Sequence, residues 1–332
     1  MEVCGTHTMS IAKAGIKQIL PENVNLISGP GCPVCVTPTG AIDEILQLSE
    51  NENVIIATYG DMLKVPGSTK GDNLARRKSL GAKVEIVYSS FDAVTLAKDN
   101  PNKDVVFLGI GFETTAPGTA AAIKVAYEEN VENFYVFSLL KLVEPALRAL
   151  IADPQFNVQG FLCPGHVAVI IGTDGFEYLA NEYKIPGVVA GFEPKEILDA
   201  IKMLLTQIKN GDAKIENAYE RLVSKEGNQI AMQTMTEVFE VEDSLWRGLG
   251  NIPNSGLKIK EKFAEHDAAK KFNIEIKDVK GSALCRCEDI ICGKASPKDC
   301  PAFGTLCTPT DPEGPCMVSS EGACAAAYKY QL

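Results

Sequence analysis

The sequence predicts an α/β protein with two Rossmann-like parallel-sheet domains, followed by a small cysteine-rich domain. From about residue 24 to residue 210, short apolar runs rich in β-branched residues alternate with helical stretches. The apolar runs show little polar alternation, as is typical of parallel strands covered on both faces. Seven of the 11 cysteines lie in the tail that begins at Cys285, where Pro and Gly interrupt the chain. Such a segment cannot build a large apolar core and needs cross-links, which thiols can supply.

The predicted elements follow a regular order along the chain. Strands are expected at residues 24–28, 54–58, 84–88, 104–110, 133–137, 159–163 and 187–191. A helix is expected at 193–208, where Ile and Leu recur at helical spacing, and residues 212–245 are expected to be helical with a polar face. We divide the chain into an N-terminal segment (1–23), a first α/β domain (24–113), a second α/β domain (114–245) and the cysteine-rich domain (246–332). Two doubly wound units are expected to enclose a crevice at the carboxyl ends of their strands.

Composition and charge exclude several classes of protein. The 332 residues carry a formal net charge of −11, so a basic surface for nucleic-acid phosphates is not expected. No apolar run approaches the length of a membrane helix, and the N-terminus lacks a signal-peptide pattern. The expected location is therefore the cytoplasm. In a reducing compartment, clustered cysteines indicate metal or redox chemistry more than structural disulfides.

The spacing of four tail cysteines favours an iron–sulfur domain. Cys287, Cys300, Cys307 and Cys324 follow the pattern C-x12-C-x6-C-x16-C, in a loop-rich segment that can wrap a [4Fe–4S] cluster. A four-cysteine zinc site and disulfides are the alternatives, although zinc ribbons use paired CxxC knuckles and the tail has none.

Three further thiols lie in the same tail. Cys285 and Cys316 flank two of the expected ligands and either form an accessory redox pair or are buried and inert. The doublet Cys285/Cys287 also leaves open which of the two is the first cluster ligand. Cys292 is expected to be structural or adventitious.

Two cysteine motifs lie near the N-terminus. Cys32 and Cys35 form a CxxC directly after a predicted strand, and they are a redox dithiol, a pair of metal ligands or a tight turn whose cysteines only pack. Cys4 and His7 in CGTHT are three positions apart and can meet one metal, or the imidazole can activate the thiol. A buried turn without chemistry explains CGTHT equally well.

Glycine-rich turns follow other predicted strands. GIGFETTAPG (109–118) contains Glu113, CPGHVAVIIG (163–172) contains His166, and YGDMLKVPGS (59–68) contributes Asp61 and Lys64. Because carboxyl ends of parallel strands open into the crevice, Glu113 and His166 are candidate site residues. Neither of the first two turns matches a nucleotide-binding loop, and ordinary strand–helix turns are the alternative.

Taken together, the motifs resemble one known family. They run in a fixed order through nearly the whole chain: MEVCGTHTM, GPGCPVCVTP, YGDMLKVPGS, GFETTAPGTA, CPGHVAVIIG, GFEP and the tail DCPAFGTLCTP…GPCMVSSEGACAAAYKY. This set is similar to the HypD family of hydrogenase maturation factors. The resemblance implies two Rossmann-like domains plus a [4Fe–4S] domain. Relatives usually carry an extra segment before EVCGTHT, where this sequence has Met1.

The resemblance also implies a function. It implies a scaffold on which the Fe(CN)2CO unit of [NiFe] hydrogenases is assembled. It also implies two partners, a HypC-type chaperone and a HypE-type protein that donates cyanide. On this sequence it implies Cys4 as an iron ligand shared with a HypC cysteine, and Cys32 and Cys35 as an essential dithiol. The four tail cysteines named above match the cluster spacing. Such a protein is an assembly scaffold with redox activity more than a conventional turnover enzyme.

The residues fit this function and leave alternatives open. Low-spin iron carrying cyanide and CO favours soft thiolate ligands, and the sequence has only three histidines to compete with them. The pairing of a cluster with a dithiol is also similar to ferredoxin–thioredoxin reductase, so a disulfide reductase is the second hypothesis. A purely structural zinc protein is a third. The reductase has no need of Cys4, which distinguishes it from the scaffold.

Overall fold

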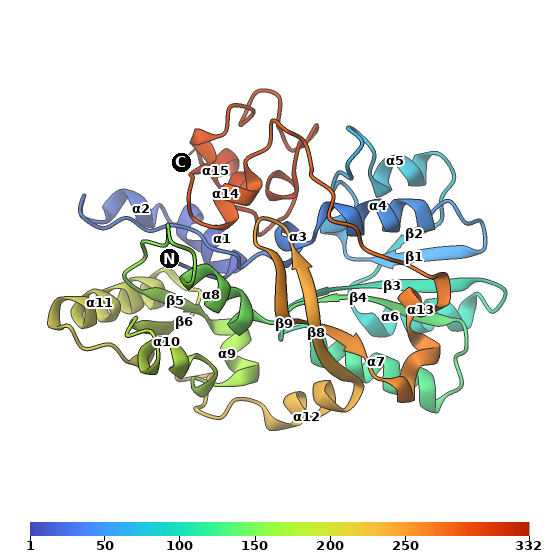
Figure 1. Cartoon of the computed structure of the whole chain (residues 1–332), viewed down its shortest axis with the longest axis horizontal. Helices are drawn as coiled ribbons and strands as arrows, with labels where there is room; N and C mark the ends of the chain where they lie inside the picture. The colour runs from blue at the N-terminus through green and yellow to red at the C-terminus, as the bar shows by residue number, and fades with distance from the viewer. Residues whose placement is uncertain (332) are drawn as a thin grey trace.

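The computed structural model describes residues 1–331 and has a mixed α/β architecture (Figure 1). Its strands form a four-stranded sheet in the order β2-β1-β3-β4, a three-stranded sheet in the order β5-β6-β7, and a two-stranded sheet of β8 and β9. The first two sheets are parallel throughout, and β8 and β9 are antiparallel. Two parallel sheets with helices between the strands confirm the predicted α/β class.

The first sheet is covered on both faces. It consists of β1 (Val54–Thr58), β2 (Val84–Ile86), β3 (Asp104–Gly111) and β4 (Phe134–Leu140). Alternate residues along β1 and β3 face opposite ways: one set packs with α4 (Thr39–Leu48), and the other packs with α6 (Ser90–Asp99) and α7 (Ala116–Glu128). The short helix α5 (Leu74–Ser79) precedes β2. Burial on both faces explains why these strands are apolar without alternation.

The second sheet is smaller. Its strands are β5 (Phe161–Pro164), β6 (Gly187–Ala190) and β7 (Ile215–Asn217), with helices α8 (Val143–Ile151), α9 (Gly165–Ile171), α10 (Glu177–Asn181) and α11 (Pro194–Asn210). The apolar stripe of α11 packs with β5, β6 and α1 (Gly5–Lys13), which confirms the helix expected at 193–208. The short helix α2 (Ile16–Ile19) contributes Ile16 to the same core.

The predicted strand at 24–28 is wrong. Residues 1–3 lie beside β5, where Leu162 N donates to Met1 O (2.9 Å) and Val3 N donates to Leu162 O (3.3 Å). The segment 24–28 is joined to these N-terminal residues through an isolated bridge between Glu2 and Ser28. A β-branched run forms a strand only when a neighbouring strand offers a continuous ladder, and none does so here within residues 1–331.

The change from one sheet to the other falls later in the chain than expected. The division at 113/114 places the strand predicted at 133–137 in the second unit, but β4 pairs with β3, from Val105↔Phe134 to Gly111↔Leu140. The first sheet therefore extends to residue 140, beyond the expected division. The pairing partner of a strand is a non-local choice, which short apolar runs alone do not specify.

Residues 212–245 are not one helix, contrary to expectation. They form β7, α12 (Gln229–Val238) and β8 (Phe239–Trp246), and β8 pairs with β9 (Gly250–Ile259). The β8–β9 hairpin lies against the first sheet, where Leu142 N donates to Ser255 O (2.9 Å). Helix α13 (Ala268–Phe272) also packs on β4. The residues after 246 thus begin with structure that belongs beside the first sheet.

The cysteine-rich tail is short of regular structure. It contains α14 (Cys287–Ile291), α15 (Ala323–Tyr330) and two short 3-10 turns, at Pro297–Asp299 and Pro315–Met317. In Figure 1 the tail lies above α1 and α3 (Pro33–Val36), and its second turn packs on α3 and α15. The tail therefore covers the two N-terminal cysteine motifs.

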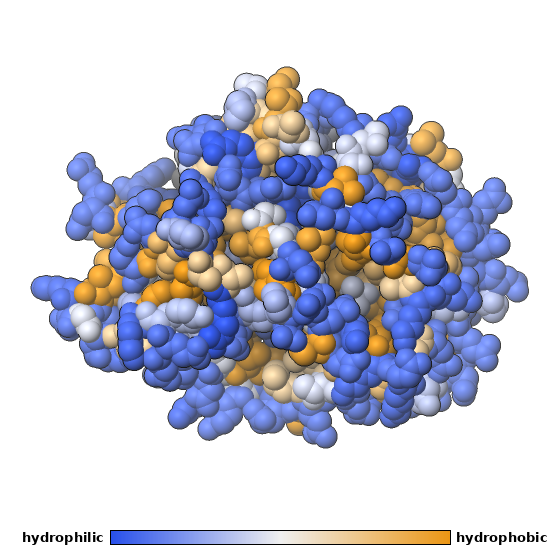
Figure 2. Space-filling model, in the orientation of Figure 1, coloured by the Kyte–Doolittle hydropathy of each residue, from blue (hydrophilic) through white to orange (hydrophobic). Residues whose placement is uncertain are grey.

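Polar residues cover much of the surface. In the view of Figure 2, charged and polar residues dominate the rim, and apolar side chains are visible mainly towards the centre. Among residues 1–331, no helix combines the length and the apolar character needed to cross a membrane.

Candidate functional site

The CGTHT and CPVC motifs pack directly on each other. Gly5 N donates a hydrogen bond to Gly31 O at 3.1 Å, and a Cβ atom at Gly31 would overlap the backbone of Cys4. Glycine at position 31 is what allows this close backbone approach. Cys4 lies just before α1, and Cys32 lies just before α3, so both thiols are at the starts of helices in one place.

Cys32 and Cys35 form a disulfide that the tail covers. Both residues are buried, and Cys35 N donates to Cys32 Sγ at 3.1 Å. Ser319 Oγ lies 3.3 Å from Cys32 Sγ and also 3.3 Å from Asp61 Oδ2. Asp61 also accepts from Ser320 N (2.8 Å), so the YGD turn holds this part of the tail in place. Asp61 is therefore a positioning residue for the tail.

A small cavity connects the disulfide to a tail thiol. Its lining includes Cys32, Cys35, Cys316 and Glu321. Cys316 follows Pro315 in the tail turn that packs on α3. The structure therefore brings one cysteine of the tail to the CPVC motif, although the two lie near opposite ends of the chain.

Cys4 is held as a neutral thiol by its surroundings. Burial raises its pKa to about 12, and the carboxyl of Glu321 adds to the rise, while the amides of His7 and Thr6 oppose it. Glu321 accepts a hydrogen bond from Thr6 Oγ1 at 2.7 Å, and burial raises the pKa of this carboxyl too. A thiol in such surroundings ionises readily only when a cation binds to it.

His7 and His166 both pack against the ring of Phe192. The ring of Phe192 is 4.7 Å from that of His7 and 4.0 Å from that of His166, centroid to centroid. Burial lowers the pKa of His7 to about 4, so its imidazole is neutral. His7 Nε2 lies 2.9 Å from Gly191 O and 3.2 Å from Ala190 O, and its Nδ1 has no partner among the described residues. The two carbonyls assign the proton to Nε2 and leave a buried lone pair on Nδ1.

Glu113 fastens the first sheet to α8. Its side chain is buried, Oε1 accepts from Val143 N at 2.9 Å, and Oε2 has no partner among the described residues. Burial raises the pKa of Glu113 to about 7, against the effect of its backbone hydrogen bonds. Its neighbour Phe112 shares one continuous core with Cys32 and Cys35. No hydrogen bond of the described structure links Glu113 itself to the cysteines.

The raised pKa of Glu113 predicts a pH-dependent stability. The Glu113 carboxyl has a pKa of about 7 in the folded protein and 4.5 in the unfolded chain, so the folded state binds its proton more tightly. The stability that this proton contributes is therefore lost as pH rises from about 4.5 to 7. The change is on the order of 3 kcal/mol. We expect Glu113→Gln, which stays neutral, to remove most of this decline. Urea unfolding between pH 5 and pH 8 measures the fall in the free energy of unfolding. Glu128→Gln, a change at an exposed position, is the control and should show the same fall as the wild type.

The tail thiols gather around Gly314. A Cβ atom at this glycine would overlap Cys285 Sγ and lie 2.7 Å from Cys287 Sγ. Cys307 Sγ accepts from Glu313 N at 3.3 Å, and Cys285 Sγ accepts from Cys287 N at 3.4 Å. Cys300 Sγ lies apart from these contacts, 3.6 Å from Leu284 O.

The thiol of Cys287 perturbs both Cys316 and Cys285. It raises the pKa of each of these thiols more than burial does. Burial also raises the pKa of Cys307, to about 11. Cys285 and Cys316 are both free thiols, so the accessory redox pair suggested by the sequence stays a prediction. Thiols this close to one another are either protonated, oxidised or bound to a metal.

The tail contains the types of group that a four-iron cluster needs, namely cysteine thiolates and N–H donors to sulfur. Within residues 1–331, no three Cys, His, Asp or Glu side chains surround one point closely enough to bind a single metal ion. A cluster is larger than one ion, takes four thiolates, and is tuned by N–H donors to its sulfurs. The tail supplies the thiolates, and the amides of Glu313 and Cys287 are such donors.

The crowding at Gly314 predicts that a single methyl group disturbs the thiol cluster. We expect Gly314→Ala to displace Cys285 and Cys287 and to reduce iron and acid-labile sulfide in anaerobically purified protein to less than half of the wild-type content. Gly118→Ala is the control, because nothing lies within 4 Å of the added methyl group there. Full metal content in Gly314→Ala would show that the two thiols do not need their present positions.

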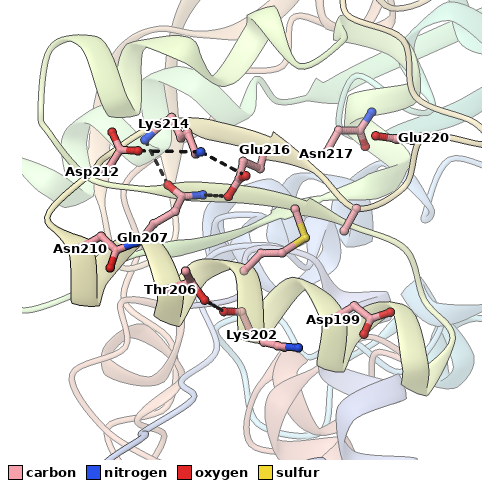
Figure 3. A pocket seen from close by; sticks show the side chains of 12 residues that line it. Asp199, Lys202, Thr206, Gln207, Asn210, Asp212, Lys214, Glu216, Asn217 and Glu220 are labelled. Atoms are coloured by element: carbon pink, nitrogen blue, oxygen red, sulfur yellow. Dashed lines mark hydrogen bonds and ion pairs between the residues drawn. The ribbon is translucent and has the colours of Figure 1, made fainter.

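A separate cavity of about 560 Å³ lies at the edge of the second sheet. Figure 3 shows its polar lining from α11 and β7, where Gln207 Nε2 donates to Glu216 at 2.6 Å and Lys214 Nζ lies 3.3 Å from the same carboxylate. Its lining contains no cysteine or histidine among the described residues, so it has none of the chemistry found beneath the tail.

Sequence reasoning missed several residues at the thiol site. Phe192 enters it only as part of GFEP, and Ser319, Glu321 and Arg247 are not singled out. Their roles come from contacts with distant segments of the chain, which no local pattern shows. Lys64, suggested by the same turn as Asp61, makes no hydrogen bond to the site in the part of the chain that the structure describes.

Fold and site together define the class: an α/β protein whose disulfide, isolated cysteine and thiol-rich tail meet at the carboxyl ends of its strands. Comparison with known proteins places it more closely. The family model HypD, described as "Hydrogenase formation hypA family", matches residues 1–331. The chain belongs to the HypD family of hydrogenase maturation factors.

Individual relatives are similar over nearly the full chain. Hydrogenase maturation factor HypD2 of Bradyrhizobium diazoefficiens is 45% identical over 99% of this chain and 88% of its own length. HypD of Cupriavidus necator is 44% identical over 99% of this chain and 89% of its own. HypD of Escherichia coli K12 is 45% identical over 100% of this chain and 88% of its own. These relatives confirm the resemblance seen in the motifs and support a role in hydrogenase maturation.

Proposed function

We propose that this chain is the scaffold on which the Fe(CN)2CO unit of a [NiFe] hydrogenase is assembled. In this proposal a HypC-type chaperone binds the chain and shares the iron with Cys4, and a HypE-type protein delivers cyanide as a thiocyanate. The iron is the cargo of the reaction. The chemistry takes place in the cytoplasm, without nucleic acid or membrane as a partner.

One observation carries the proposal: a free N-terminal cysteine, a disulfide and a thiol of the tail lie close together. Cys4 packs on the loop that holds Cys32, and a cavity beside that loop is lined by Cys35 and Cys316. A candidate metal ligand, a disulfide and a tail thiol are thus within one small volume. A scaffold that must hold iron and reduce a group bound to sulfur needs these parts close together.

The disulfide suits a two-electron step. When R–S–C≡N takes up two electrons, the S–C bond breaks, the sulfur leaves as a thiolate, and cyanide leaves as an anion that the iron takes. Oxidation of the Cys32 and Cys35 thiols to a disulfide releases two electrons and two protons, so electrons balance. In this proposal the Cys32–Cys35 disulfide is the state after such a step.

We propose a [4Fe–4S] cluster in the tail that returns electrons to this disulfide one at a time. Cys300, Cys307 and Cys324 are three of its ligands, and Cys287 is the fourth by sequence spacing. The thiols of Cys285 and Cys287 both lie beside Gly314, so Cys285 is the alternative fourth ligand. With Cys287 as the ligand, Cys285 and Cys316 form the accessory redox pair. Either way, Cys316 lies between the cluster thiols and CPVC.

Anaerobic purification of the chain with a HypC-type chaperone tests the proposal. Iron and sulfide are counted, and infrared spectra are searched for cyanide and CO stretches. Both bands and about four iron and four sulfide per chain, beyond the cargo iron, are expected. Zinc without acid-labile sulfide would contradict the cluster, and a chaperone complex without the bands would contradict the scaffold.

The disulfide reductase remains the second candidate, because Cys316 lines the cavity of the CPVC disulfide. A reductase passes electrons from the cluster to the disulfide and then to a thioredoxin-like partner. It requires Cys32 and Cys35 but not Cys4. Retained activity in Cys4→Ser, with loss in Cys32→Ser, would favour it.

A further inference from the structure

Arg247 is a buried cation without a carboxylate partner. The residue is 8% exposed, and no ion pair of residues 1–331 includes it. Its Nε donates to Thr37 O at 3.0 Å and its Nη1 donates to Thr39 Oγ1 at 2.7 Å, whereas Nη2 has no partner among the described residues. An unpaired buried charge is costly, so its retention calls for an anion that the described residues do not provide.

The position of Arg247 relates it to both thiol centres. On one side, its backbone N–H donates to Val36 O at 2.9 Å and its side chain to Thr37 O, the two residues that follow Cys35. On the other side, a Cβ atom at Gly281 would lie 3.4 Å from Arg247 Nη1. Arg247 thus lies between CPVC and the residues that lead into the cysteine-rich tail.

The tail segment that carries two of the thiols is attached here at both ends. Gly281 lies at the Arg247 guanidinium, and Cys285 N donates to Ser282 O at 3.0 Å. At the other end, Cys292 Sγ lies 3.3 Å from the carbonyl oxygen of Gly248, the residue after Arg247. The stretch between these attachments contains Cys285 and Cys287.

We propose that Arg247 is the buried counter-charge for the electron that the tail cluster takes up, and that it thereby raises the potential of the cluster. This inference rests on the proposed cluster. Four thiolates and a four-iron cluster form an anion, and one-electron reduction adds a further negative charge. A fixed cation in a poorly solvated position stabilises the reduced form more than the oxidised form. Arg247 touches neither iron nor substrate and acts through charge and position.

Two pairs of variants separate charge from packing. Arg247→Gln removes the charge, and Arg247→Lys keeps it. Gly281→Asp places a carboxylate beside the intact guanidinium, and Gly281→Asn adds a side chain of the same size without charge. Lys298→Gln is the control for loss of an exposed cation of the tail, since Lys298 is exposed and forms no ion pair among residues 1–331.

The readout is the midpoint potential of the cluster, measured by an anaerobic redox titration followed by electron paramagnetic resonance, after iron and sulfide have been counted. We expect Arg247→Gln and Gly281→Asp to make reduction about tenfold less favourable, which lowers a one-electron potential by about 59 mV. Arg247→Lys, Gly281→Asn and Lys298→Gln should remain close to the wild type. The Gly281 pair decides the question if Arg247→Gln does not fold.

Two results would overturn the inference without touching the proposed function: an unchanged potential in Gly281→Asp with full metal content, or equal shifts in the charged and neutral members of a pair. Absence of acid-labile sulfide from the wild-type protein would instead refute the cluster, and the role of Arg247 with it.

Discussion

We expect Cys4→Ser to abolish the infrared bands of cyanide and CO in the chain purified with a HypC-type chaperone. A serine hydroxyl is a hard, weakly acidic donor and replaces a thiolate poorly on low-spin iron. The burial that raises the pKa of Cys4 to about 12 would disfavour an alkoxide even more. The expected loss of band intensity is at least tenfold.

The same variant should keep its tail cluster. Cys4 lies before α1, whereas the proposed cluster ligands all follow residue 284, so iron and sulfide bound to the tail should stay at wild-type levels. His7→Ala should weaken the bands without removing them, because His7 is held by the carbonyls of Ala190 and Gly191 and acts beside Cys4. Full-intensity bands in Cys4→Ser with the chaperone bound would show that Cys4 is not the iron ligand.

Strand-end reasoning from the sequence placed one candidate near the CGTHT motif. His166 follows the carboxyl end of β5, and its ring stacks on Phe192, which also packs on His7. Six of the seven predicted strands correspond to β1–β6, because runs such as VIIAT are buried on both faces and apolar throughout. Local composition is sufficient for such elements.

The errors share one physical cause, which is pairing between distant segments. Residues 24–28 have the composition of a strand but no ladder to join within the described chain, and β4 joins β3 across the expected division. Residues 239–245 lie in the stretch predicted to be helical, yet β9 offers them an antiparallel partner. Arg247 was missed for the same reason, since its surroundings come from Thr37 and Thr39, near the other end of the chain.

The tail is the part whose order depends most on what its thiols bind. Its regular structure amounts to two short helices and two 3-10 turns, although side chains such as Ile290, Ile291 and Met317 join the main core and α15 packs on α1. A segment with so little regular structure gains much of its stability from cross-links. Loss of the cluster should therefore also uncover Cys32 and Cys35.

Replacing one proposed ligand tests this dependence. We expect Cys307→Ala to lose the brown colour and to retain less than a tenth of the acid-labile sulfide, because loss of one of the four thiolates leaves one iron without its protein ligand and makes the cluster labile. The residues after about 281 should then be cut by protease far faster than in the wild type, and Cys32 and Cys35, once reduced, should react faster with thiol reagents. Sulfide assay, limited proteolysis and thiol counting measure the three effects.

Cys292→Ala is the matched control for Cys307→Ala. Cys292 is buried to a similar degree in the same segment, but its Sγ faces the carbonyl oxygen of Gly248 instead of the other thiols. We expect this variant to keep its colour, its sulfide and its protease resistance, with at most a loss of about 1–3 kcal/mol from the smaller side chain. If both variants lost the cluster equally, general destabilisation of the tail would explain the result. If only Cys307→Ala lost it, the thiolate itself holds the metal, and the fold of the tail follows from that bond.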